Sequence, residues 1–202
     1  MLHTLMLAPQ AEQMSTIYFT TASLDGFLAD QDGSLDWLFE VPREVDPHEE
    51  VAAFFGRVGA FAMGATTYQW MIDNLGVVQD PDEWRSWYET VPAWVFTHRS
   101  LPPVPGIPIR FVEGDVREVH REMAETAGSK DVWLVGGGEL VGAFDDAGLL
   151  DQIEVAIQPV ILGGGAQLLP RRIPPSRLEL QSVQRLGQSA TLTYRVKPRP
   201  ST

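Results

Sequence analysis

Cysteine is absent from this 202-residue sequence, and histidine is scarce. Without cysteine there can be no disulfide, thiolate metal site, iron–sulfur cluster or cysteine nucleophile. The four histidines form no i, i+4 pair and have no carboxylate at metal-ligand spacing: His3, His48, His98 and His120. We therefore expect no metal site. The sequence also lacks a Gly-x-Ser-x-Gly elbow and a Gly-Lys-Ser/Thr phosphate loop, which argues against a hydrolase and a P-loop kinase.

Basic residues are also few: the sequence has 15 lysines and arginines and 27 acidic residues, which gives a formal net charge of −12. This balance argues against nucleic acid and an anionic membrane surface as partners. No apolar run approaches the roughly 20 residues needed to span a bilayer, and residues 1–13 lack the basic flank of a secretory signal. A cytoplasmic protein is expected. A nucleotide ligand stays open, since local amide dipoles and one or two cations can bind it.

The length and the 44% hydrophobic content suit one domain, for which about 100–200 residues is usual. We expect residues 1–14 to be a loosely ordered N-terminal extension and residues 15–198 to form a single domain. Met14, directly before the first predicted strand, is a candidate natural start.

Strand-like and helix-like patterns alternate along the chain. Runs rich in β-branched and aromatic residues predict strands over residues 16–22, 60–63, 93–96, 109–112, 131–136 and 152–157. Capping residues and apolar periodicity predict helices that begin near residues 46, 66, 80, 116 and 138. In the first of these helices, one apolar face is expected from Val51, Phe54, Phe55 and Val58. The final segments, 178–183 and 190–196, alternate like an antiparallel pair, so we expect an α/β fold: a mainly parallel central sheet, antiparallel C-terminal edge strands and helices on both faces.

Three glycines, Gly136 to Gly138, separate a predicted buried strand from a helix. Such a junction can bind an anion, because glycine lets the backbone approach a ligand and the first helical N–H groups point at it. Tight packing alone is the other explanation. A third explanation is a Rossmann site with Glu154 as the ribose-binding acid. The last glycine of the Rossmann motif should occupy position 141, but that residue is Val141 and the glycine, Gly142, comes one position later.

Four motifs follow one another within residues 16–197. They are Ser23-Leu24-Asp25-Gly26, Met63-Gly64-x-x-Thr67-Tyr68, Val135-Gly136-Gly137-Gly138 with Glu139-Leu140, and Gly148-Leu149-Leu150-Asp151-Gln152-Ile153 leading to Pro159-Val160-Ile161-Leu162-Gly163-Gly164-Gly165. In this order they resemble the dihydrofolate reductase-like superfamily, most specifically the branch with the reductase domain of bifunctional riboflavin-biosynthesis proteins. The resemblance implies a three-layer dihydrofolate reductase-like fold.

The resemblance also implies that NADPH binds across the carboxyl ends of the strands. The residues that it assigns to the cofactor are Thr21, Leu28, Gly64, Thr66, Thr67, Thr97, His98, Arg99, Val135, Gly136, Gly137, Gly138, Glu139 and Leu140. Among them, the two glycine-containing helix starts would share the pyrophosphate, and Arg99 would contact the 2′-phosphate. Ala65 stands where many dihydrofolate reductases have a cation, so selectivity for NADPH depends more heavily on Arg99. A surface arginine at a strand end is the alternative.

The substrate side is assigned by the same resemblance to Leu24, Trp37, Glu50 and Phe54. Glu50 is the nearest equivalent of the first-helix carboxylate that binds the pterin and assists protonation, with Glu49 and then His48 as alternatives. Asp25 is the second catalytic candidate, in a loop over the nicotinamide. Asp25 also suits an ordinary turn, and Trp37 suits an apolar anchor under a long loop.

Together these observations predict an NADPH-dependent reductase that transfers hydride to a C=N or C=O group of a ribosylaminopyrimidine or a pterin-like molecule. No zinc-deaminase signature is present, so any role in riboflavin biosynthesis would be reduction alone. The rival hypothesis is a non-catalytic nucleotide or small-molecule binding protein on the same fold. A homodimer is expected from the resemblance only.

Overall fold

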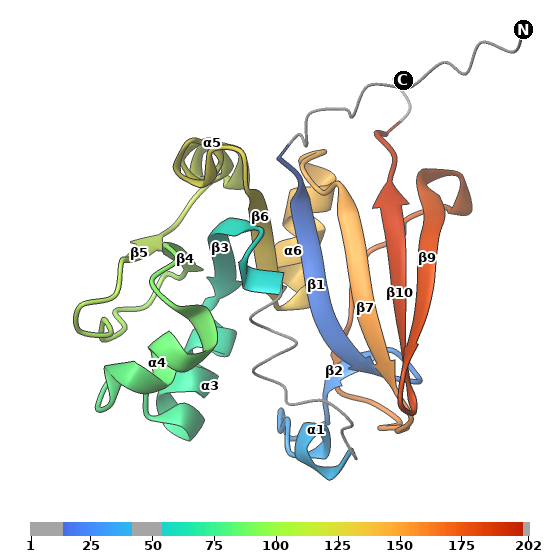
Figure 1. Cartoon of the computed structure of the whole chain (residues 1–202), viewed down its shortest axis with the longest axis horizontal. Coiled ribbons are helices and arrows are strands. Elements are labelled where there is room, and N and C mark those ends of the chain that lie inside the picture. The colour runs from blue at the N-terminus through green and yellow to red at the C-terminus, as the bar shows by residue number, and fades with distance from the viewer. Residues whose placement is uncertain (1–13, 42–53, 200–202) are drawn as a thin grey trace, which may run out of the picture.

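The computed structural model describes residues 14–41 and 54–199, and its centre is an eight-stranded sheet in the order β5-β4-β3-β6-β1-β7-β10-β9 (Figure 1). The strands are β1 Thr16–Ser23, β3 Val58–Gly64, β4 Ala93–Phe96, β5 Ile109–Val112, β6 Asp131–Gly136, β7 Gln152–Gln158, β9 Leu178–Leu186 and β10 Ser189–Val196. All pairings from β5 to β7 are parallel, and β10 is antiparallel to both of its neighbours. The predicted α/β sheet with an antiparallel C-terminal edge is thereby confirmed.

Helices cover both faces of this sheet (Figure 1). They are α1 Trp37–Glu40, α3 Ala65–Leu75, α4 Pro81–Tyr88, α5 Val116–Ala127, α6 Gly138–Asp146 and the 3-10 turn η1 Pro175–Arg177. A separate two-stranded sheet joins β2 (Phe27–Ala29) to β8 (Ala166–Gln167). Within the described ranges, no helix is long and apolar enough to cross a membrane. The same ranges contain no group of three metal-ligating side chains.

Two hydrophobic cores lie on opposite faces of the sheet, because successive strand residues point to opposite sides. On β1, Tyr18 belongs to the core beneath α5 and α6, together with Met123 and Phe144. Its neighbour Phe19 packs instead against the other core, which includes Trp84 of α4. The second core ends near β1, so the same face of β7, β10 and β9 is left with mostly polar side chains.

Val58 was expected on the apolar face of the first long helix, and this prediction is wrong. Val58 is the first residue of β3 and pairs with Asp131 of β6. Phe54 and Phe55 are buried as expected, but the chain turns at residues 56–57 and the strand begins there. A buried β-branched residue fits the apolar pattern of a helix and that of a strand equally well. Pairing with β6 makes Val58 part of a strand. The start of that helix, at residue 46, lies outside the described residues.

A buried ion pair fastens α6 to the C-terminal part of the chain. Asp145 is 0% exposed and Arg177 5%. The Arg177 guanidinium donates Nη2 to Oδ1 at 2.7 Å and Nη1 to Oδ2 at 3.1 Å. Arg177 also donates Nε to the Lys197 carbonyl, and Arg199 adds a contact of 3.0 Å to Asp145. The C-terminal end of α6, η1 and the residues after β10 therefore depend on one carboxylate.

Replacing Arg177 with methionine should lower the free energy of unfolding by about 3 kcal/mol, because it leaves a buried carboxylate with only the partly exposed Arg199. The matched control is Arg195→Met, whose pair with Glu179 at 2.8 Å is exposed; we expect less than about 1 kcal/mol there. Urea unfolding followed by tryptophan fluorescence measures both. Equal losses in the two variants would contradict a special role for the buried pair.

Candidate functional site

Two helix N-termini meet at the carboxyl edge of the parallel strands. Gly64 ends β3 and is the N-cap of α3, and Gly137 is the N-cap of α6. Because β3 and β6 are adjacent and Met63 pairs with Gly136, the two helix starts are close. A methyl group placed on Gly64 would be 3.9 Å from the Gly136 carbonyl oxygen and the Gly137 nitrogen. The structure thus brings both predicted phosphate-binding segments to one location.

Neither of these two helices has a side-chain cap, whereas α4 and α5 do. The Asp80 carboxylate accepts from the Asp82 N–H at 3.1 Å to cap α4, and Asp115 accepts from the Arg117 N–H at 2.8 Å to cap α5. The glycine N-caps of α3 and α6 make no such bond. First-turn N–H groups have no partner within their own helix, so both helix ends keep donors and dipole ends suited to an anion.

The three glycines before α6 differ in what surrounds them. Gly136 has φ 138°, which favours glycine, and a side-chain carbon on Gly136 or Gly137 would meet nothing within 4 Å. At Gly138 the same carbon would lie 2.6 Å from the Leu168 carbonyl oxygen and 2.7 Å from that of Gln167. Gly138 is therefore required by packing of the protein's own chain, and the open space beside the backbone is at Gly136 and Gly137.

The remaining residues predicted around this junction have distinct surroundings. Val135 packs against the core beneath α4, and Leu140 against the core beneath α5 and α6. The Glu139 carboxylate pairs with Arg171 at 2.9 Å, which neutralises an acid in the first turn of α6. In α3, Thr66 is exposed and Thr67 half-buried in the first turn. The predicted cofactor residues of this edge are thus backbone groups and threonines, with the apolar side chains serving the core.

The segment after β4 lies on the same edge, one strand away from Gly64. Gly64 pairs with Phe96, and Thr97 follows directly. The Arg99 N–H donates to the Thr97 hydroxyl at 2.9 Å, and His98 Nδ1 lies 3.0 Å from a Glu113 carboxylate oxygen. Arg99 is exposed and makes no ion pair within the described ranges. It therefore supplies a cation to this edge, whereas His98 contacts the acidic Glu113.

Asp25 joins two loops at the end of β1. One carboxylate oxygen accepts from the Ser23 hydroxyl at 2.7 Å and the Leu162 N–H at 3.1 Å, and the other from the Gly163 N–H at 2.8 Å. The Ser23 hydroxyl and then these backbone donors hold the pKa of the Asp25 carboxyl below its usual range. Asp25 is therefore ionised at neutral pH and engaged as an acceptor. This contact positions the loop, and a catalytic role for Asp25 stays a prediction.

The other predicted substrate residues separate in the structure. Trp37 is buried, and its indole N–H donates to the Leu28 carbonyl at 3.2 Å. This matches an anchor beneath the loop. Leu24 is exposed, and its N–H donates to the Val160 carbonyl. Phe54, by contrast, lines a groove on the sheet, whereas Glu50 lies outside the described residues.

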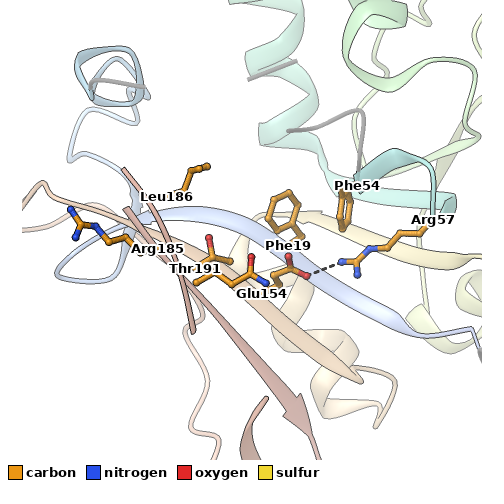
Figure 2. Close-up of a pocket in the computed structure, with 8 residues that line it drawn as sticks. Phe19, Phe54, Arg57, Glu154, Arg185, Leu186 and Thr191 are labelled. Atoms are coloured by element: carbon orange, nitrogen blue, oxygen red, sulfur yellow. Dashed lines mark hydrogen bonds and ion pairs between the residues drawn. The ribbon is translucent and has the colours of Figure 1, made fainter. Parts of the chain in front are cut away.

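That groove has a volume of about 370 Å³ and lies on the polar face of the C-terminal half of the sheet (Figure 2). It is lined by Phe19, Phe54, Arg57, Glu154, Gln184, Arg185, Leu186 and Thr191. Thr21 pairs with Ala156, which pairs with Thr191. Thr21 also stands two residues from Phe19, about 7 Å along β1. The groove therefore adjoins the predicted nicotinamide position.

An ion pair crosses the groove. Arg57 Nη2 donates to Glu154 Oε2 at 2.7 Å, and the guanidinium lies 4.8 Å from the centre of the Phe54 ring (Figure 2). The Phe54 ring is in turn 4.4 Å from that of Phe19. The sequence leaves Glu154 open as the ribose acid of a Rossmann site, but in the structure β1 separates its strand β7 from β6 and the glycines. No pattern in the sequence indicates the Arg57–Glu154 contact, which joins residues 97 positions apart.

Alanine in place of Gly138 should lower the free energy of unfolding by about 1–3 kcal/mol, because the new carbon meets fixed backbone carbonyls. Gly142→Ala is the matched control in the same helix. There the carbon meets Arg171 side-chain atoms, the nearest at 2.7 Å, so one side chain must shift but no backbone must, and helix propensity favours alanine by up to about 1 kcal/mol. Thermal and urea unfolding compare the two, and a Gly138→Ala protein as stable as Gly142→Ala would contradict the packing assignment.

Known proteins are similar to this chain over most of its length. The uncharacterized protein YwjB of Bacillus subtilis (strain 168) is 28% identical over 90% of this chain and 98% of its own length. A crystal structure of a protein assigned to riboflavin biosynthesis from Shewanella sp. PV-4 is 26% identical, with a TM-score of 0.71 over 91% of this chain and 99% of that one. YyaP, a second uncharacterized B. subtilis protein, is 26% identical over 78% of this chain and 81% of its own length.

Two more distant structures share the fold. A Thermotoga maritima diaminohydroxyphosphoribosylaminopyrimidine deaminase/5-amino-6-(5-phosphoribosylamino)uracil reductase is 18% identical, with a TM-score of 0.64 over 91% of this chain and 57% of that one. Enterococcus faecalis dihydrofolate reductase, solved with NADP(H), is 11% identical, with a TM-score of 0.55 over 90% and 96%. The family model of the RibD C-terminal domain matches residues 15–192, and the chain therefore belongs to the RibD C-terminal domain family.

Proposed function

We propose that this protein is an NADPH-dependent reductase that transfers hydride to a C=N or C=O group of a ribosylaminopyrimidine or pterin-like molecule. The observation on which this depends is the pair of uncapped helix N-termini, α3 and α6, that meet beside open glycine backbone. Family membership and the NADP(H) complex of the dihydrofolate reductase neighbour support the oxidoreductase class and the cofactor.

The strand order gives the cofactor a direct path along the carboxyl edge. Neighbouring strands β4, β3, β6 and β1 present Arg99, Gly64, Gly136 and Thr21 in that spatial sequence. Strands lie about 4.8 Å apart, so this path suits an extended dinucleotide. Arg99 would hold the 2′-phosphate, the two helix starts the pyrophosphate, and Thr21 with Leu28 would border the nicotinamide.

Hydride transfer itself is chemistry that the bound cofactor supplies. The protein's contribution is to hold the acceptor in the groove next to Thr21 at reacting distance and to limit access of water. Asp25 keeps the loops that follow β1 and β7 in a fixed relation. Glu50, predicted to assist protonation of the product, lies outside the described residues and stays a prediction.

One observation favours the rival function, non-catalytic binding of a nucleotide or small molecule. The acids that the structure describes here are already engaged, Glu154 by Arg57 and Asp25 by three hydrogen bonds. A site without a free acid can bind a ligand without protonating it.

Titration with NADPH, followed by quenching of tryptophan fluorescence, tests the cofactor. NADPH oxidation in the presence of 5-amino-6-(5-phosphoribosylamino)uracil or dihydrofolate, followed at 340 nm, then separates the two functions. We expect binding and oxidation. Binding without oxidation of any candidate would favour the rival, and absence of NADPH binding at millimolar concentration would exclude both cofactor-based functions.

Reversing the charge at Arg99, with Arg99→Glu, should weaken NADPH binding by roughly tenfold or more and leave NADH binding nearly unchanged. A charge-assisted contact to phosphate contributes about 1.5–3 kcal/mol, and only NADPH has the 2′-phosphate. Arg121→Glu, on an exposed position of α5, makes the same change in net charge elsewhere. Equal losses for NADPH and NADH would refute the 2′-phosphate role.

We also propose a homodimer formed through the face of β9 and β10 that is opposite the groove. Val183 and Leu180 are 61% and 51% exposed and pair with Leu192 and Tyr194, so they continue one apolar face on an edge strand. Exposed apolar patches and edge strands favour association. Analytical ultracentrifugation should give a dimer, and Leu180→Glu with Val183→Glu a monomer. The exposed control Gln188→Glu should stay dimeric; a dimer in the double variant would place the interface elsewhere.

A further inference from the structure

The Glu154 carboxylate is bonded on one side only. Both Arg57 Nη2, at 2.7 Å, and Gln152 Nε2, at 3.2 Å, donate to Oε2. Within residues 14–41 and 54–199, no donor is bonded to Oε1. The side chain is only 20% exposed and lines the groove. Since a carboxylate oxygen has lone pairs for about two hydrogen bonds, Oε1 is an unused acceptor on a side chain that lines ligand-sized space.

The surroundings of this acceptor are flat and apolar on one side and polar on the other. Phe19 and Phe54 form the apolar side, with ring centres 4.4 Å apart. Thr191 and Gln184, which pair across β10 and β9, form the polar side. A volume of about 370 Å³ is within the range of small-molecule pockets. Such a site accommodates a planar ring with hydrogen-bonding edges.

Arg57 indicates which kind of chemical group fits beside Phe54 and Glu154 in this groove. Its guanidinium is a planar group with several N–H donors, it lies over the Phe54 ring at 4.8 Å, and it donates to Glu154. A heterocycle with adjacent N–H groups offers the same combination of a flat face and donors along one edge. Its own N–H can reach Oε1 while Arg57 keeps Oε2 and balances the negative charge.

We propose that Glu154 Oε1 accepts a hydrogen bond from a ring or exocyclic N–H of a planar, N–H-bearing heterocycle of the aminopyrimidine class, which lies against Phe19 and Phe54. Glu154 is a binding and orienting residue for the hydride acceptor, and in this sense the inference rests on the proposed function. The ion pair with Arg57 assigns it the role of acceptor, distinct from the protonation predicted for Glu50.

Isothermal titration without cofactor tests this directly with two uracils of similar shape. 5,6-Diaminouracil has several N–H donors, whereas 1,3-dimethyluracil has none. We expect the wild-type protein to bind 5,6-diaminouracil at least tenfold more tightly. Glu154→Gln should weaken that binding by roughly 10- to 100-fold, since a hydrogen bond to a charged group contributes about 1.5–3 kcal/mol. Glu154→Asp should restore part of it.

Glu179→Gln is the matched control, because this carboxylate on β9, which β10 separates from β7, also accepts from an arginine, Arg195, at 2.8 Å but does not line the groove. It should bind 5,6-diaminouracil as the wild type does. Equal binding of the two uracils, no binding of either, or an unchanged affinity in a folded Glu154→Gln protein would overturn the inference. The wild-type ligand comparison holds even if the variant fails to fold.

Titrating Glu154→Gln with NADPH separates this inference from the proposed function. The helix ends that would bind the cofactor follow β3 and β6, whereas Glu154 is on β7. The NADPH affinity of Glu154→Gln should therefore stay within about twofold of wild type. Failure of the cofactor proposal would appear as absent NADPH binding in every variant. Failure of the Glu154 inference would appear only with the uracils.

Discussion

The register between β3 and β6 is the constraint on which the site depends. Ala62 pairs with Leu134, but Met63 pairs with Gly136, so β6 has one extra residue at this point. Such a bulge bends its strand and redirects the residues after it, and bulges are common beside functional sites. Here it brings Gly136 level with Met63, the residue of β3 that precedes Gly64. The two helix starts share one location because two parallel strands end together.

The local electrostatics of this edge differ from those of the whole chain. A net charge of −12 would repel a dinucleotide at long range, yet the part of the edge at the two glycine junctions presents helix N-termini, with Arg99 one strand away. The one acid in the first turn of α6, Glu139, is paired with Arg171, which Asp146 also holds at 3.0 Å. A local field set by backbone dipoles and by paired acids can therefore oppose the overall charge.

Much of the fold could be predicted from the sequence, because strands with β-branched residues and glycine-terminated junctions are local signals. The Gly64 and Gly136–Gly137 junctions were found in this way, since glycine before a helix is visible in a short window. Val58 was placed in a helix because local periodicity cannot distinguish a buried helix end from a strand start. Arg57 and Glu154 were not foreseen as partners. Their contact is created by strand pairing over a long separation, which no short pattern contains.

The missing side-chain caps of α3 and α6 would also couple the stability of the folded state to the anionic ligand proposed to bind there. A Ser, Thr, Asp or Asn cap stabilises a helix by roughly a few tenths of a kcal/mol more than a glycine cap, and these two glycine-capped helices lack that contribution. An anionic ligand bound at both ends would replace it, and by mass action the stability would grow with the logarithm of ligand concentration. The ligand concentration in a cell would then set the fraction of this protein that is folded and protected from degradation. The amount of the protein would therefore rise and fall with the availability of the ligand.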